Sequence, residues 1–94
     1  MAKKLVVGIN MFSMNQSIYE LHEDGKVDIV AATALDRLGE AVCSLIDSSN
    51  EIEEIELDGP TEYIEKYGFE ILEELAKNYS DRNVRLNLNG KVFN

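Results

Sequence analysis

The period of the hydrophobic pattern changes from two to 3.6 residues after the third predicted strand, and that change most constrains the fold of this chain. Apolar residues follow the two-residue period of β-strands up to about residue 31, and helix-like 3.6-residue spacing first appears at residue 35. The pattern predicts strands at 5–9, 17–22, 27–31, 52–58 and 84–88, and helices at 35–46 and 61–79. A chain of 94 residues holds one hydrophobic core, so we predict a single α/β domain spanning residues 1–94.

Two local signals suggest how the strands are ordered. The nearly continuous apolar run at 5–9 is typical of a strand covered on both faces, and Asp24-Gly25 predicts a hairpin. Strands connected through a helix are expected to be parallel, with right-handed crossovers. The prediction is a five-stranded mixed sheet, β-β-β-α-β-α-β, in the order 3-2-1-4-5. Its last strand, at 84–88, lies at an edge protected only by Arg85 and Lys91, which offers a route to a homodimer.

The acidic residues are concentrated in one segment. Residues 51–74 contain ten acids and one base, whereas the rest of the chain contains eight of each, so this segment accounts for the whole net charge of −9. A field of one sign attracts basic partners and repels polyanions. The candidate binding residues of this acidic surface are Glu54, Glu56, Asp58, Glu62, Tyr63, Glu65 and Glu73. The alternative is that the acids form a solvated face that only keeps the protein soluble.

Several short segments resemble the ribonuclease H-like superfamily, in particular the core of Holliday-junction resolvases and actin-like ATPases. Residues 6–10 (VVGIN) are similar to the first strand of that core, and 17–21 with 23–27 are similar to its hairpin. Residues 55–60 (IELDGP) lie where resolvases carry an acidic residue, and Gly68 matches a glycine of the following helix. The resemblance implies the sheet order given above and, in active members, metal-dependent chemistry.

The chain departs from this family at the positions that carry its chemistry. Asn10 stands where the first strand normally ends in aspartate, and no Asp or Glu follows Asp81, so the carboxylate set for two metal ions is incomplete. Residues 11–14 are too bulky for a phosphate-binding loop. We therefore expect no catalytic residues, no metal ligands and no cofactor. Glu56 and Asp58 would carry the chemistry if the chain were nevertheless a divergent metal-dependent nuclease.

The remaining residues of chemical interest also have ordinary structural explanations. His22 is the single histidine and is expected at the surface, since no nucleophile accompanies it in the sequence. Cys43 is the single cysteine, which excludes an internal disulfide, and its place in an apolar helical stripe predicts a small buried thiol. Tyr63 and Tyr67 lie one helical turn apart, so they would either anchor a partner or flank the core.

The function predicted from these features is non-catalytic protein binding or scaffolding, with a basic protein as partner. One alternative is an acidic nucleic-acid mimic of the phage type that inhibits a DNA- or RNA-binding protein. The divergent nuclease is a third reading. The net charge of −9 argues against direct nucleic-acid binding. Because the sequence shows neither a membrane span nor a signal peptide, we expect a cytoplasmic protein without membrane contact.

Overall fold

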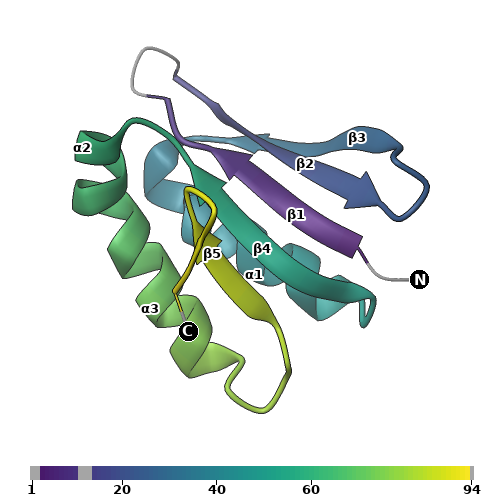
Figure 1. Ribbon diagram of the computed structural model, residues 1–94. Coiled ribbons are helices and arrows are strands. Elements are labelled where there is room, and N and C mark those ends of the chain that lie inside the picture. The colour runs from purple at the N-terminus through teal and green to yellow at the C-terminus, as the bar shows by residue number, and fades with distance from the viewer. Residues whose placement is uncertain (1–2, 11–13, 94) are drawn as a thin grey trace.

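The computed structural model describes residues 3–10 and 14–93, and shows an α/β fold with one mixed sheet (Figure 1). The strands are β1 (Lys3–Gly8), β2 (Gln16–His22), β3 (Val27–Thr33), β4 (Ile52–Asp58), β5 (Arg85–Leu88) and β6 (Lys91–Val92). The helical elements are the 3₁₀ turn η1 (Leu35–Arg37), α1 (Leu38–Ser48), α2 (Thr61–Tyr63), the π-helical turn η2 (Ile64–Gly68) and α3 (Phe69–Asn78). The described helices are too short or too polar to span a membrane.

The strand order is β3-β2-β1-β4-β5-β6, which confirms the order predicted for the first five strands. Strand β1 lies inside the sheet, antiparallel to β2 and parallel to β4, as the helical crossover requires. The predicted hairpin between β2 and β3 is also confirmed. Gly25 has a φ of 88°, and its N–H donates to the carbonyl of His22 at 3.0 Å.

The sheet has six strands, so the prediction of five was wrong. Asn89 and Gly90 both have positive φ, 47° and 81°, and reverse the chain after β5. β6 then pairs antiparallel with β5, and Phe93 N donates to Leu86 O at 2.7 Å. β5 is therefore interior, and the predicted edge at 84–88 is incorrect. The Asn-Gly dipeptide is a strong hairpin signal, but a two-residue strand after it leaves almost no periodic pattern to recognise.

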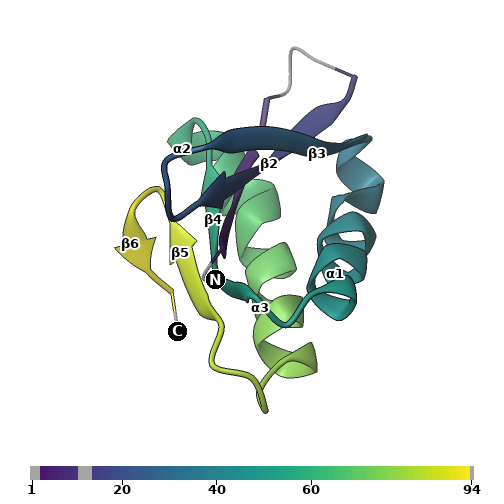
Figure 2. The ribbon, with the colours of Figure 1, turned by 90° about the vertical axis from the view of Figure 1, so that its right-hand side faces the viewer.

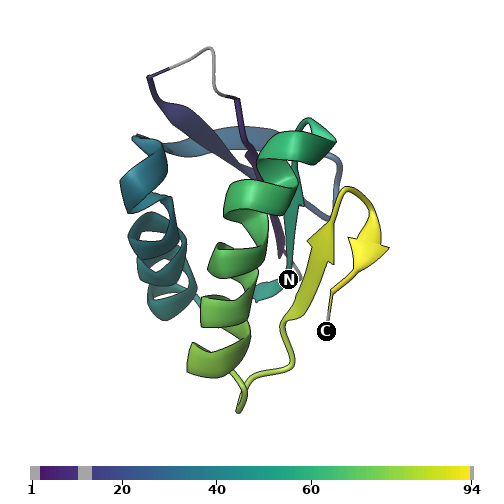
Figure 3. The ribbon, with the colours of Figure 1, turned by 90° about the vertical axis from the view of Figure 1, so that its left-hand side faces the viewer.

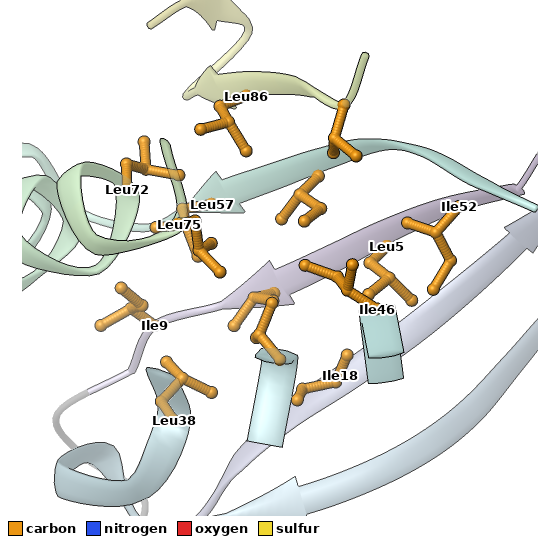
Figure 4. Close-up of a cluster of buried hydrophobic side chains, with 14 of the residues drawn as sticks. Leu5, Ile9, Ile18, Leu38, Ile46, Ile52, Leu57, Leu72, Leu75 and Leu86 are labelled. Atoms are coloured by element: carbon orange, nitrogen blue, oxygen red, sulfur yellow. The ribbon is translucent and has the colours of Figure 1, made fainter. Parts of the chain in front are cut away.

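All the helices cover the same face of the sheet, which overturns the prediction that the first strand is covered on both faces (Figures 2 and 3). Alternate residues of β1 and β4 point into the layer between sheet and helices, where they meet the buried side chains of α1 and α3 (Figure 4). This core includes Leu5, Val7, Ile18, Leu38, Val42, Ile46, Ile55, Leu57, Leu72, Leu75 and Leu86. The opposite face, called the open face below, carries no helix of the described chain.

The second helical segment changes its winding before it crosses the sheet. Its first turn, α2, leads into the π-helical turn η2, and α3 continues from Phe69. Gly68 ends the π turn at a crowded position, because a Cβ there would lie 3.2 Å from Cδ1 of Leu88 in β5. The close contact at Gly68 is thus made by a sheet side chain. π-Helical turns often accompany functional positions, and this one includes Tyr67.

Candidate functional site

The acidic residues predicted to form one binding surface lie on opposite faces of the domain. Glu54, Glu56 and Asp58 alternate with the buried Ile55 and Leu57 along β4, so they lie on the open face. The other predicted residues, Glu62, Tyr63, Glu65 and Glu73, belong to the helical layer on the far side. The three glutamates of this second group are exposed, whereas Tyr63 is half-buried and packs against the core. The structure therefore divides the acidic segment into two groups.

The acids of the open face are paired with cations. Lys4 Nζ lies 2.8 Å from Glu56 Oε1 and 3.0 Å from Glu54 Oε2, and Arg85 lies 2.9 Å from Glu54 Oε1. Asn87 also donates to Glu54 Oε2 at 2.7 Å. β1, β4 and β5 bring these groups side by side, since Lys4 is the β1 neighbour of Glu54, which in turn neighbours Arg85. Most of the negative charge on this face is neutralised locally.

The carboxyl groups of Asp58 and Glu56 are in hydrogen-bond contact at the end of the same network. Partial burial raises the pKa of Asp58 to about 6, with further contributions from the hydrogen bond to Glu56 and from its negative charge. The pKa of Glu56 is lowered by the hydrogen bond from Asp58 and by that from Lys4. In the protonated pair Asp58 is therefore the donor and Glu56 the acceptor. This arrangement suppresses the charge of Asp58 in mildly acidic solution.

The helical layer contains a groove whose two walls are both acidic. The groove has a volume of about 580 Å³ and lies between the start of the first helical segment and the middle of the second. Its lining residues are Leu35, Asp36, Gly39, Glu40, Tyr67, Glu70, Ile71 and Glu74. The four carboxylates come in pairs from opposing segments, and no lysine or arginine is among the lining residues. We call this feature the acidic groove.

The apolar and small residues of the acidic groove give it depth. Leu35 and Ile71 are half-buried against the core, and Tyr67 comes from the π-helical turn. Gly39 leaves space on the α1 side, because the nearest atom to a Cβ built there is Glu74 Oε2, at an ordinary contact distance of 3.6 Å. The groove thus combines an apolar floor with carboxylates along both sides, a chemistry suited to a basic amphipathic segment.

None of the residues that line this groove is among the candidate binding residues predicted from the sequence. Glu70 and Glu74 belong to the acidic segment, but Asp36 and Glu40 come from the part of the chain with balanced charge. Each pair has the i, i+4 spacing that places two side chains on one helical face, and this signal is readable in the sequence. The sequence does not show that the two pairs oppose each other, because their opposition depends on the packing of α1 against α3.

The other residues singled out in the sequence have structural partners. Tyr79 Oη donates to the carbonyl of Cys43 at 3.1 Å and to Asp47 at 2.9 Å, and burial together with these groups raises the pKa of Tyr79. His22 Nε2 lies 3.2 Å from Glu20 and 3.1 Å from Asp28, and Cys43 is a half-buried free thiol. These contacts tie the residue that follows α3 to α1, and β2 to β3.

A second large cavity, about 590 Å³, lies where the C-terminal ends of α1 and α3 meet β4 and β5. Its most prominent polar side chain, Arg82, donates to the carbonyls of Ile46 at 2.8 Å and Ser49 at 3.0 Å. Arg82 therefore satisfies carbonyl groups at the end of α1, which is a structural role. In the part of the chain that the structure describes, no three His, Cys, Asp or Glu side chains are grouped as metal ligands.

Comparison of the chain with protein-family models, with curated proteins and with solved structures finds no match.

Proposed function

We propose that this domain is a non-catalytic binding module that captures a basic, amphipathic segment of another protein in the acidic groove. The observation that carries the proposal is the opposition of Asp36 and Glu40 to Glu70 and Glu74 across an apolar floor. Lysine or arginine side chains of the partner would meet the carboxylates, and its apolar side chains would contact Leu35, Tyr67 and Ile71. The proposal keeps the predicted basic partner and moves its binding site to the groove.

The groove favours binding over catalysis because of the residue types that line it. Its titratable side chains are four carboxylates and a tyrosine, with no histidine, cysteine, serine or lysine as nucleophile or base. Exposed carboxylates act mainly by attracting the partner at long range, which raises the association rate and weakens as salt is added. Contact with the apolar floor would supply the part of the affinity that is insensitive to salt.

The nucleic-acid mimic is less well supported by the geometry. Such a mimic needs dense, unpaired carboxylates on one surface, because duplex DNA carries about one charge per 1.7 Å. The sheet acids Glu54 and Glu56 are paired with Lys4 and Arg85, and the helix acids lie on the other side of the sheet. Because the acids are divided between the two faces, the groove carboxylates are the acids that are both closely spaced and next to an apolar floor.

The proposal is tested with a synthetic helical peptide that carries leucine on one face and lysine on the other. Two triple variants are compared by fluorescence anisotropy: Glu40→Gln with Glu70→Gln and Glu74→Gln, and, as the matched control, Glu62→Gln with Glu65→Gln and Glu73→Gln. Both remove three charges from helical positions. We expect the groove variant to bind about tenfold more weakly at low salt, and the control to change by about twofold or less. Equal losses would show that net charge, and not the groove, drives binding.

A further inference from the structure

The open face of the sheet carries an apolar patch that no other described element covers. Val6, Tyr19 and Ile29 are successive neighbours across β1, β2 and β3, and Leu21 neighbours Val27 across β2 and β3. Val27 is 56% exposed and Ile29 is 67% exposed, unlike the apolar side chains on the helix side of the same strands. Contiguous apolar residues exposed in this way mark interaction surfaces. We call these five residues the apolar patch.

The rest of the open face, formed by the polar side chains of β4 and β5 with Lys4 of β1, is called its polar half. Most of the charge on this polar half is neutralised by ion pairs. Lys4 and Arg85 are paired with Glu54 and Glu56, so two cations balance two carboxylates. Asp58 adds one further carboxylate, with a pKa raised to about 6 by partial burial and by Glu56. A basic partner is attracted to the acidic groove, whereas a second copy of this acidic chain meets least repulsion on a face whose charges are internally paired.

Strand pairing at the sheet edges is a less suitable route to self-association. β3 has a register shift opposite Ile18 and Tyr19 and carries Asp28, and both bulges and charges on an edge strand discourage pairing with another chain. At the other edge, β6 has only two residues and begins with Lys91. The open face itself, with its apolar patch beside a balanced polar half, is the better surface for a second copy.

We propose that two copies of this chain associate face to face through their open faces, with the two apolar patches in contact across a two-fold axis. The strands contain two to seven residues each, and at about 3.3 Å per residue and about 4.8 Å between strands they present roughly 520 Å² of flat area. That area approaches the roughly 800 Å² of accessible surface that each partner buries in a standard interface. Because the groove lies in the helical layer, on the other side of the sheet, the dimer leaves both acidic grooves accessible. This inference is independent of the proposed function.

Sedimentation equilibrium of the full chain, at concentrations up to about 300 µM, tests the proposal. We expect a species of twice the monomer mass, with a dimer fraction that rises between about 50 mM and about 500 mM NaCl because salt screens the repulsion between the acidic copies. Binding at the acidic groove should respond to salt in the opposite direction. A monomer at every concentration and salt level would overturn the proposal.

Two variants locate the interface. Ile29→Lys should weaken the dimer at least about tenfold, even though it lowers the net negative charge, because it places an ammonium group within the apolar contact. Met14→Lys is the control, with the same charge change at a residue that is 91% exposed in the turn before β2. Circular dichroism verifies that both variants fold. Equal dimerisation of the two variants contradicts the proposal, as does new hydrogen-exchange protection along the outer edge of β3, which would indicate edge-to-edge pairing.

Discussion

Asn89 is bonded twice through its side-chain amide to the backbone of Gly59. Its Nδ2 donates to the Gly59 carbonyl at 3.0 Å, and the Gly59 N–H donates to its Oδ1 at 3.0 Å. The pair joins the turn between β5 and β6 to the junction between β4 and α2, thirty residues away in sequence. Asn89 also has a positive φ of 47°, a conformation that asparagine tolerates better than most residues. Both properties make Asn89 a stabilising residue of this turn.

Replacement of Asn89 should therefore destabilise the fold in a graded way. Asn89→Ala loses both hydrogen bonds and places alanine at positive φ, which we expect to lower the free energy of unfolding by about 1–2 kcal/mol. Asn89→Gly loses the bonds but accommodates the backbone, so its loss should be smaller. Urea denaturation measures both. A glycine variant less stable than the alanine variant would argue against the backbone contribution.

Two glycines should respond in opposite ways to alanine. A Cβ at Gly59 would lie 2.8 Å from the carbonyl oxygen of Ile9, which is backbone, so Gly59→Ala should destabilise by about 1–3 kcal/mol. At Gly39 the nearest atom is 3.6 Å away, and Gly39→Ala should stabilise α1 by up to about 1 kcal/mol. Thermal unfolding of the two variants distinguishes these effects. Similar changes in both would contradict the difference in packing described here.

The raised pKa of Asp58 beside Glu56 predicts a specific pH dependence. Because the folded pKa of Asp58 is raised from 3.8 to about 6, its favourable contribution is fully present below about pH 4 and is lost as the pH rises through about 6. Asp58→Asn cannot ionise, so the stability of this variant relative to the wild type should increase from pH 5 to pH 7.5, by on the order of 1 kcal/mol after solvent screening.

The control for this titration is the exposed Asp24→Asn variant, which should show no such trend. Asp24 lies in the turn between β2 and β3, where its carboxylate accepts from Lys26 N at 3.0 Å. Chemical denaturation at several pH values measures both differences. A stability difference for Asp58→Asn that is constant between pH 5 and pH 7.5 would mean that the pair does not hold its proton in this range.

The sequence predicts the sheet order because the crossover rule and the Asp24-Gly25 turn leave few alternative strand orders. It does not predict the open face. The apolar run at 5–9 contains both core residues and Val6, which lies in the exposed patch, so the run looks the same as a strand covered on both sides. The acidic groove escapes prediction for a different reason. Its walls come from residues 35–40 and 67–74, and only helix packing brings them together.

Filling the groove without changing its charge tests the central claim most directly. Gly39→Met places a side chain between the two acidic walls, while Ser44→Met makes a comparable addition at an exposed position of α1 that does not line the groove. The measurement is the affinity of each variant for the basic amphipathic peptide, with circular dichroism confirming that both are folded. We expect Gly39→Met to bind about tenfold more weakly and Ser44→Met to bind like the wild type. Wild-type affinity in a folded Gly39→Met variant would contradict the assignment of the groove as the binding site.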